Sequence, residues 1–183
     1  MSRIEIRCSF MRNGQKVQEI RSLDEGITRL GISLFSGDKE LIGVEIPEGI
    51  KQIDDFAFAN CPKLKEVHIS NTVNKIGDNA FYFCESLESL SIPDSVKEIG
   101  DYALANCIKL TEITLSESIT EIGYCLFYNC ESLRKVRVPL KVAYIRRHAF
   151  WGCESLEKVI IPQSTRIEPN TLPYNTIIIS VTN

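Results

Sequence analysis

The amino-acid sequence predicts a solenoid, in which 23-residue repeats stack along a single axis. Three observations predict this fold. The chain has 183 residues, of which 44% are hydrophobic and 25% charged, an ordinary composition for one soluble folded unit. Apolar residues recur with a period of 23, and a repeat this short is stabilised by stacking on its neighbours. Five of the seven cysteines mark the same period: Cys61, Cys84, Cys107, Cys130 and Cys153.

A β-hairpin is expected first, at the N-terminus. Asn13-Gly14 is a favoured pair for a two-residue hairpin turn, so we predict a hairpin over residues 3–22, within an N-terminal cap of residues 1–26. One alternative for its second strand includes a β-bulge, because Val17 and Ile20 are three residues apart. Four apolar residues of the first strand alternate with polar ones: Ile4, Ile6, Cys8 and Phe10.

Six repeats are expected over residues 27–164, each with one short strand. Val67 and Ile69 are two residues apart, which is the alternation of a half-buried strand. The same pair of positions holds Val44 and Ile46 one period earlier. A globular β-sandwich also contains many short strands, but an unvarying period is not expected in that fold.

The C-terminal cap is predicted over residues 165–183, with a last strand from residue 176 to 181. An uncovered last strand would present an open sheet edge. Either Leu172, Pro173 and Tyr174 fold over this edge, or the edge pairs with another chain.

Residues 87–107, LESLSIPDSVKEIGDYALANC, resemble the BspA-like, treponemal type of leucine-rich repeat. Proline after the strand, Ile-Gly-Asp, Ala-Phe and Cys recur together over about three quarters of the chain. The resemblance implies a right-handed leucine-rich-repeat superhelix, with one strand per repeat and irregular or 3-10 structure opposite. It also implies a non-enzymatic protein that binds other macromolecules, in a family whose members are often bacterial or protozoan surface proteins.

A few positions depart from the repeat pattern. Asp54 and Arg146 stand where other repeats have the glycine of Ile-Gly-Asp, and residues 124–126 break the Asp-x-Ala pattern. Where this glycine is kept, we expect a backbone position with positive φ.

The periodic cysteines are predicted to form a buried column of free thiols. Parallel side chains one strand apart do not bring two sulfur atoms to bonding distance, and the chain has no CxxC pair of the kind that binds zinc. We therefore expect no metal site, no disulfide and no cofactor. Cys125 belongs to another column, with residues as different as Asn79 and His148, so we expect it to be partly exposed and the most reactive thiol.

Catalysis is not indicated by any motif. A Cys-His nucleophilic pair requires a histidine near the thiol. Of the two histidines of the chain, His148 lies a full turn away from Cys125 in the predicted stack, and His68 lies in a strand. No nucleophile elbow, phosphate-binding glycine loop or metalloprotease motif is present. The sequence predicts that the protein is not an enzyme.

The strand face, meaning the side chains that flank the inward strand positions, is the predicted binding surface. Its candidate ligand-binding residues are Glu45, Glu66, His68, Ser89, Ser91, Glu112, Thr114, Lys135, Arg137, Lys158 and Ile160. They change from acidic, through small and neutral, to basic along the stack.

The net charge of −3 conceals this gradient. The net charge is +3 over residues 1–22, −11 over residues 23–133 and +6 over residues 134–166. Either neighbouring repeats have similar charges without a function, or the basic block binds an acidic segment of a partner. The basic block consists of Arg134, Lys135, Arg137, Lys141, Arg146, Arg147 and Lys158.

An aromatic ridge is also predicted, made of Tyr82, Tyr128 and Trp151, each directly after the inward residue of its repeat. These side chains either anchor a protein or sugar partner, or shield the turn beneath them.

The sequence thus predicts a non-enzymatic scaffold that binds a protein ligand on the strand face, with adhesion as the setting that the resemblance implies. The alternative is an assembly subunit that oligomerises through the C-terminal edge or the aromatic ridge. Nucleic acid is not expected as a partner, because a phosphate backbone would run into the acidic middle. Membrane insertion is not expected either. The chain shows no signal peptide, which predicts a cytoplasmic protein, or a secreted or surface protein if a signal was trimmed.

Overall fold

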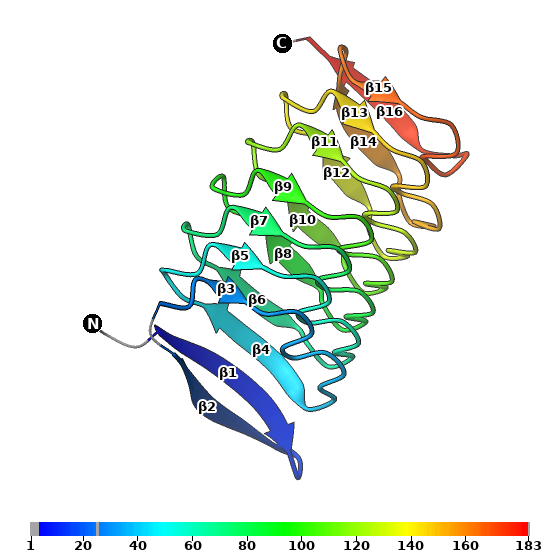
Figure 1. Cartoon of the computed structure of the whole chain (residues 1–183). Helices are drawn as coiled ribbons and strands as arrows, with labels where there is room; N and C mark the ends of the chain where they lie inside the picture. Colours follow the sequence, from blue (N-terminus) through cyan, green and yellow to red (C-terminus); the bar gives the residue numbers. More distant parts are fainter. Residues whose placement is uncertain (1–3, 25, 183) are drawn as a thin grey trace.

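The computed structural model describes residues 4–24 and 26–182, and the chain winds through about seven turns of a β-solenoid. The turns stack along one axis, and the two termini lie at opposite ends (Figure 1). Residues 1–3, 25 and 183, which belong to the predicted caps, lie outside the described residues. The described residues contain no helix, so none is long and apolar enough to cross a membrane.

Two rows of strands run along the stack. The first row, whose outward side is the strand face, contains β2 (Gln15–Leu23), β1 (Ile4–Arg12), β4 (Leu41–Ile46), β6 (Glu66–Ile69), β8 (Ser89–Ser91), β10 (Glu112–Thr114), β12 (Lys135–Arg137), β14 (Lys158–Pro162) and β16 (Ile177–Val181). The second row contains β3 (Arg29–Leu30), β5 (Gln52–Ile53), β7 (Lys75–Ile76), β9 (Glu98–Ile99), β11 (Glu121–Ile122), β13 (Tyr144–Ile145) and β15 (Arg166–Ile167).

The solenoid fold is confirmed, and the second row adds to it, since the sequence predicted one strand per repeat. Each strand of the second row has only two residues, and in most of them a buried isoleucine or leucine follows a more polar residue. Turns connect the two rows on both sides, where the resemblance implied irregular or 3-10 structure.

The parallel strands pair equivalent residues of successive repeats. Val44 lies opposite Val67, and Lys135 lies opposite Lys158, in each case 23 residues on. A column in the sequence is therefore a column in space. The last turn is shorter, because Lys158 pairs with Ile177, only 19 residues further along the chain.

The core is a set of stacked columns between the two rows. The ring of Phe58 stacks on those of Phe35 and Phe81, with centroids 5.1 Å and 5.3 Å apart. Phe127 stacks on Phe150 in the same way at 5.2 Å. All five side chains are buried. Each turn thus covers the apolar residues of the one before it.

The N-terminal hairpin is present, and β1 pairs with β4 in antiparallel fashion. The pairing of β1 with β2 is unbroken, so Val17 and Ile20 require no bulge between these strands. Instead, the register shifts between Ser9 and Phe10, where β1 meets β4. Ile20 lies on the outward side of β2 and is 59% exposed.

The prediction for the glycine of Ile-Gly-Asp is wrong. The glycines with positive φ are others, and Gly77 and Gly100 are required by lack of space instead. A Cβ atom at Gly100 would overlap the Oδ1 atom and the backbone nitrogen of Asp78 in the preceding repeat. Positive φ occurs two residues after this column, for example at Asn79 and Tyr102.

The aspartate after each of these glycines joins one turn to the next. The backbone N–H of Asp78 donates to Asp55 Oδ1 at 2.9 Å, and that of Asp101 donates to Asp78 Oδ1 at 2.9 Å. Tyr124 N–H donates to Asp101 in the same way. The close approach that excludes a side chain at the glycine is what brings each N–H within reach of the carboxylate.

We expect Gly100→Ala to destabilise the protein by about 1–3 kcal/mol, because the added methyl group overlaps packed backbone. Gly31 occupies the same column in the first repeat, where a Cβ atom would meet nothing within 4 Å. Gly31→Ala should therefore change the free energy of unfolding by less than about 0.5 kcal/mol. Urea denaturation of both variants measures this difference, and equal losses would contradict the packing argument.

Candidate functional site

The structure brings the predicted ligand-binding residues together on the strand face. Nine of them are exposed: Glu45, Glu66, His68, Ser89, Ser91, Glu112, Thr114, Lys135 and Arg137. The remaining two, Lys158 and Ile160 on β14, are half-buried. The parallel register aligns them in two columns that run the length of the repeats.

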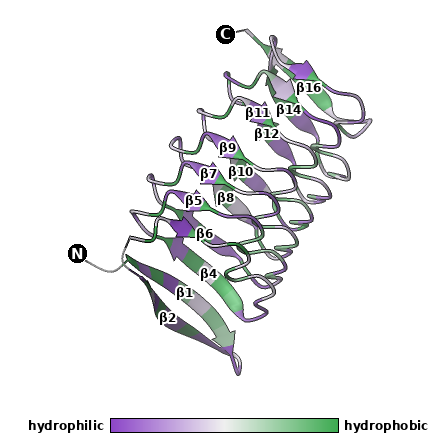
Figure 2. Cartoon of the chain, viewed as in Figure 1, coloured by the Kyte–Doolittle hydropathy of each residue, from purple (hydrophilic) through white to green (hydrophobic). Residues whose placement is uncertain are grey.

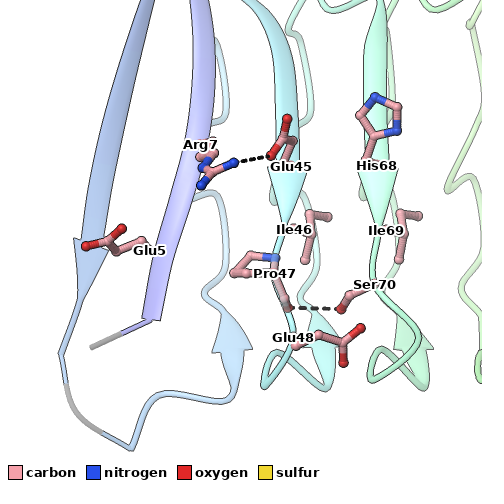
Figure 3. A pocket seen from close by; sticks show the side chains of 9 residues that line it. All are labelled: Glu5, Arg7, Glu45, Ile46, Pro47, Glu48, His68, Ile69 and Ser70. Atoms are coloured by element: carbon pink, nitrogen blue, oxygen red, sulfur yellow. Dashed lines mark hydrogen bonds and ion pairs between the residues drawn. The ribbon is translucent and has the colours of Figure 1, made fainter. Parts of the chain in front are cut away.

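The hairpin adds residues to this face that sequence reasoning missed. Arg7 on β1 forms an ion pair with Glu45 on β4, with its Nη1 atom 3.7 Å from the Oε2 atom. The two side chains line a hollow of about 560 Å³ together with His68, as Figure 3 shows. The alternation of β1 already placed Arg7 on the side opposite Ile6 and Cys8, which is the signal that would have assigned it to the face.

A second hollow, of about 640 Å³, surrounds Gly43, and we call it the Gly43 hollow. Gly43 has no side chain at a position where Glu66 stands on the neighbouring strand. Ser9 and Ile20 of the hairpin form one side of this hollow, Glu45 and Glu66 contribute carboxylates, and Arg7 and Lys16 contribute cations. The acidic end of the face is thus also a depression.

The basic patch, consisting of Lys135, Arg137 and Lys158, occupies β12 and β14. Lys135 and Lys158 are directly opposite each other in the strand pairing. Among the described residues, none of the three forms an ion pair. Like charges opposite each other in a sheet repel, and no described carboxylate lies within ion-pair distance of the three cations.

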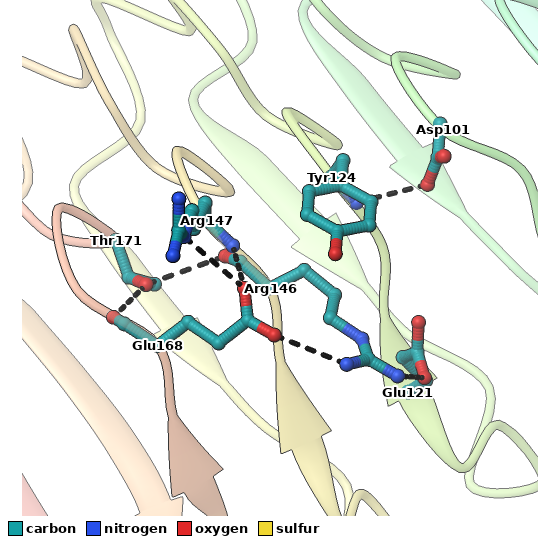
Figure 4. A network of polar contacts seen from close by, with 7 residues as sticks. All are labelled: Asp101, Glu121, Tyr124, Arg146, Arg147, Glu168 and Thr171. Atoms are coloured by element: carbon teal, nitrogen blue, oxygen red, sulfur yellow. Dashed lines mark hydrogen bonds and ion pairs between the residues drawn. The ribbon is translucent and has the colours of Figure 1, made fainter.

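Two residues of the predicted basic block point elsewhere. Arg146 lies beside the second row, where its guanidinium binds Glu121 at 2.8 Å and Glu168 at 3.0 Å, as Figure 4 shows. Arg147 donates its backbone N–H to Glu168 at 3.1 Å. The hydrogen bonds from Arg146 lower the pKa of the Glu168 carboxyl. Both arginines therefore bind residues of neighbouring turns and are not part of the strand face.

Sequence comparison agrees with this architecture. The profile of the "BspA type Leucine rich repeat region" matches in six copies, over residues 4–91 and 51–179. The chain belongs to the BspA-type leucine-rich repeat family. No curated protein matches the chain.

Solved structures of bacterial leucine-rich repeat proteins are similar to this BspA-type chain. A T. pallidum leucine-rich repeat protein is 26% identical, with a TM-score of 0.73 over 82% of this chain and 75% of its own. One from Eubacterium ventriosum is also 26% identical, with a TM-score of 0.60 over 66% of this chain and 34% of its own. One from Bacteroides ovatus is 18% identical with a TM-score of 0.50 over 94% of this chain and 69% of its own, a likeness of fold alone.

The BspA-type repeat is a scaffold that suggests a role in protein interaction, and proteins of this family are typically not enzymes. Within the described residues, no group of three or more His, Cys, Asp or Glu side chains is placed to hold a metal ion. His68 lies on the strand face, whereas His148 packs its ring against Trp151 in a turn.

The aromatic ridge lies in the turns that follow the buried phenylalanines. Tyr82 and Tyr128 are half-buried, and Trp151 is 39% exposed. Ala105 occupies the position between Tyr82 and Tyr128 and is buried, so the ridge is interrupted. The rings of Tyr82 and Phe83 pack edge to face, with their centroids 4.6 Å apart. These contacts are those of side chains that cover a turn.

The C-terminal edge of the BspA-type solenoid is covered only in part by the segment before it. Leu172 packs against the core, but Tyr174 is 96% exposed, and β16 exposes Ile177, Ile178 and Ile179. The hydrophobic colouring of β16 stands out at this end (Figure 2). Ile177 and Ile179 continue the outward column of Lys158 and Ile160.

The periodic cysteines are fully buried, and each thiol is free. The S–H group of Cys84 donates to the carbonyl of Phe58 at 3.2 Å, and that of Cys107 donates to Phe81 at 3.3 Å. Burial raises the pKa of the Cys107 thiol from 9.0 to about 12. Cys125 is only 5% exposed, so the expectation of a partly exposed thiol is wrong. It is nevertheless the most exposed of the seven cysteines, and its being the most reactive thiol stays a prediction.

The raised thiol pKa values predict a loss of stability at alkaline pH. Above pH 9 the thiols ionise in the unfolded chain but stay protonated in the folded one. The stability that the protonated thiols contribute is therefore complete below pH 9 and is lost as the pH rises towards 12. Each such thiol should lower the free energy of unfolding by about 1.4 kcal/mol per pH unit in this range.

Urea denaturation between pH 9 and 12 measures that slope. The Cys107→Ala variant is less stable at neutral pH because it leaves a cavity, but its slope should be shallower by the share of one thiol. Identical slopes would show that the Cys107 thiol ionises in the folded state.

Proposed function

We propose that the chain is a non-enzymatic scaffold that binds a protein ligand on the strand face, and that the basic patch recognises an acidic segment of that ligand. The observation that carries this proposal is the lack of any ion pair at Lys135, Arg137 and Lys158 among the described residues. Among the other exposed cations, Lys63 and Lys75 have carboxylate partners, whereas Lys65 and Lys97 have none in the described part of the chain. What sets the patch apart is that Lys135 and Lys158 also lie directly opposite each other on the strand face.

The geometry of the patch suits an extended acidic segment. Lys135 and Lys158 are adjacent along the stack, about 4.8 Å apart at the backbone, so carboxylates of one ligand reach both. Ile177 and Ile179 extend the same outward side with apolar surface. Charge then steers the ligand and sets its orientation, while the isoleucines supply contact area.

A second candidate is assembly through β16, favoured by the exposure of Ile177 and Ile179 at an open edge. Pairing with a strand of another chain would satisfy the backbone groups of this edge and bury both side chains. In this candidate the charge of the basic patch is incidental.

A peptide titration tests the first candidate. The probe is an extended peptide of alternating glutamate and isoleucine, and its counterpart replaces each glutamate with lysine. We expect the acidic peptide alone to bind, with an affinity that falls as salt is added, because exposed charges are screened. Fluorescence anisotropy of labelled peptide measures both.

We expect Arg137→Glu to weaken binding of the acidic peptide about tenfold, the effect of roughly 1.4 kcal/mol. Lys97→Glu makes the same change of charge sign beside the second row, away from the strand face, and should leave binding unchanged. Binding that ignores salt and Arg137→Glu would contradict the proposal, and so would equal binding of both peptides.

A further inference from the structure

One outward column of the strand face is complementary to itself when it is reversed. Its six members lie in parallel register, one per repeat: Gly43, Glu66, Ser89, Glu112, Lys135 and Lys158. Turned end for end, the column places Glu66 against Lys135, the Gly43 hollow against Lys158, and Ser89 against Glu112. No two like charges of this column face each other in the reversed arrangement.

We propose that a second copy of this chain binds the strand face, packed face to face about a twofold axis that runs parallel to the strands between β8 and β10. Such an axis keeps the strand direction and reverses the order of the strands, so β6 faces β12 and β4 faces β14 of the second copy. The interface is isologous, and every contact occurs twice. This inference rests on the proposed use of the strand face and names its partner.

The ion pairs of this interface use charges that are free in the single chain. Among the described residues, Glu66 and Lys135 are exposed and neither has an ion-pair partner. In the dimer each Glu66 meets Lys135 of the other copy. Opposite charges at matched positions set the register of an interface and raise the rate of association.

The Gly43 hollow supplies the matching shape. It is a depression of about 640 Å³ lined by the carboxylates of Glu19, Glu45 and Glu66 and by the cations of Arg7 and Lys16. Arg7 pairs with Glu45 within the chain. In the dimer the hollow lies opposite Lys158, a long side chain that needs space. In the second outward column Glu45 faces Ile160, and His68 faces Arg137.

Some pairs of like charge oppose the dimer. Lys65 and Arg134 precede β6 and β12, are exposed, and face each other across the interface. Asp94 and Glu117 follow β8 and β10, are exposed, and face each other in the same way. They lie at the margin of the face, where solvent screens like charges. The strands of the first row give a face about 40 Å long, and roughly 600 Å² per copy is at the low end for a specific interface. The dimer is therefore weak and sensitive to salt.

Sedimentation velocity over a concentration series at low ionic strength tests the proposal on the whole chain. Wild-type protein should dimerise, and added salt should dissociate the dimer. Glu66→Lys and Lys135→Glu should each raise the dimer dissociation constant at least about tenfold, because each places like charges together at both contacts. Lys65→Glu should lower this constant, and Lys97→Glu should leave it unchanged.

Two combinations make the test specific for the twofold arrangement. The double variant Glu66→Lys/Lys135→Glu restores opposite charges and should dimerise like the wild type. An equimolar mixture of the two single variants should form a mixed dimer, whereas a self-pair of either variant joins like charges at both contacts. In the mixed dimer one contact joins the two substituted side chains, which are opposite in charge. The other contact joins the native Glu66 of one copy to the native Lys135 of the other.

A monomer at every concentration would overturn the inference. A dimer that ignores all of these charge reversals would also overturn it, because it would indicate pairing through β16. Neither result bears on the proposed ligand site. Glu66→Lys leaves the basic patch intact, so peptide binding by this variant reports on that site separately.

Discussion

The close approach of successive turns is the constraint on which the rest of this structure depends. Backbone groups of one turn bond directly to the next, as when Phe58 N–H donates to the carbonyl of Ala80 at 2.8 Å and Phe81 N–H to that of Ala103 at 2.8 Å. In the 23-residue repeats these bonds recur at equivalent positions, which requires repeats of the same length and the same path. The fixed period, the single residue type in most core columns and the missing side chain at Gly77 and Gly100 all follow from this requirement.

Much of the fold could be predicted, because a strict period converts positions in the sequence into positions in space. The row of strands, the hairpin and the buried thiols are read from columns and alternation. The second row could not be, since segments of two residues, such as Gln52–Ile53, are too short to show a period. The reason for Gly100 and the contacts of Arg146 depend on residues 22 to 25 positions away, whose approach a single sequence does not reveal.

The candidate site was predicted in part for the same reason. Outward positions of the repeats were found by counting, and the structure places them on one face. What counting missed lies outside the period: Arg7 and Ile20 come from the antiparallel hairpin, and Ile177 and Ile179 from the shortened last turn. The core residues and the strand-face residues thus have separate roles. The columns beneath determine the backbone, and the residues above them are free to differ from one repeat to the next.

The hydrogen bonds of the cysteine column make it an internal reporter. Each of the five thiols donates to the carbonyl of a buried phenylalanine or leucine 26 residues earlier in the chain, at 3.0 to 3.3 Å. The S–H stretching vibration absorbs in an infrared window that other protein groups leave empty, and its frequency responds to hydrogen bonding. Substituting six of the seven cysteines, Cys8 and Cys125 included, would leave one oscillator in a chosen turn. The spectrum of such a series would reveal in which order the turns separate when the solenoid is heated.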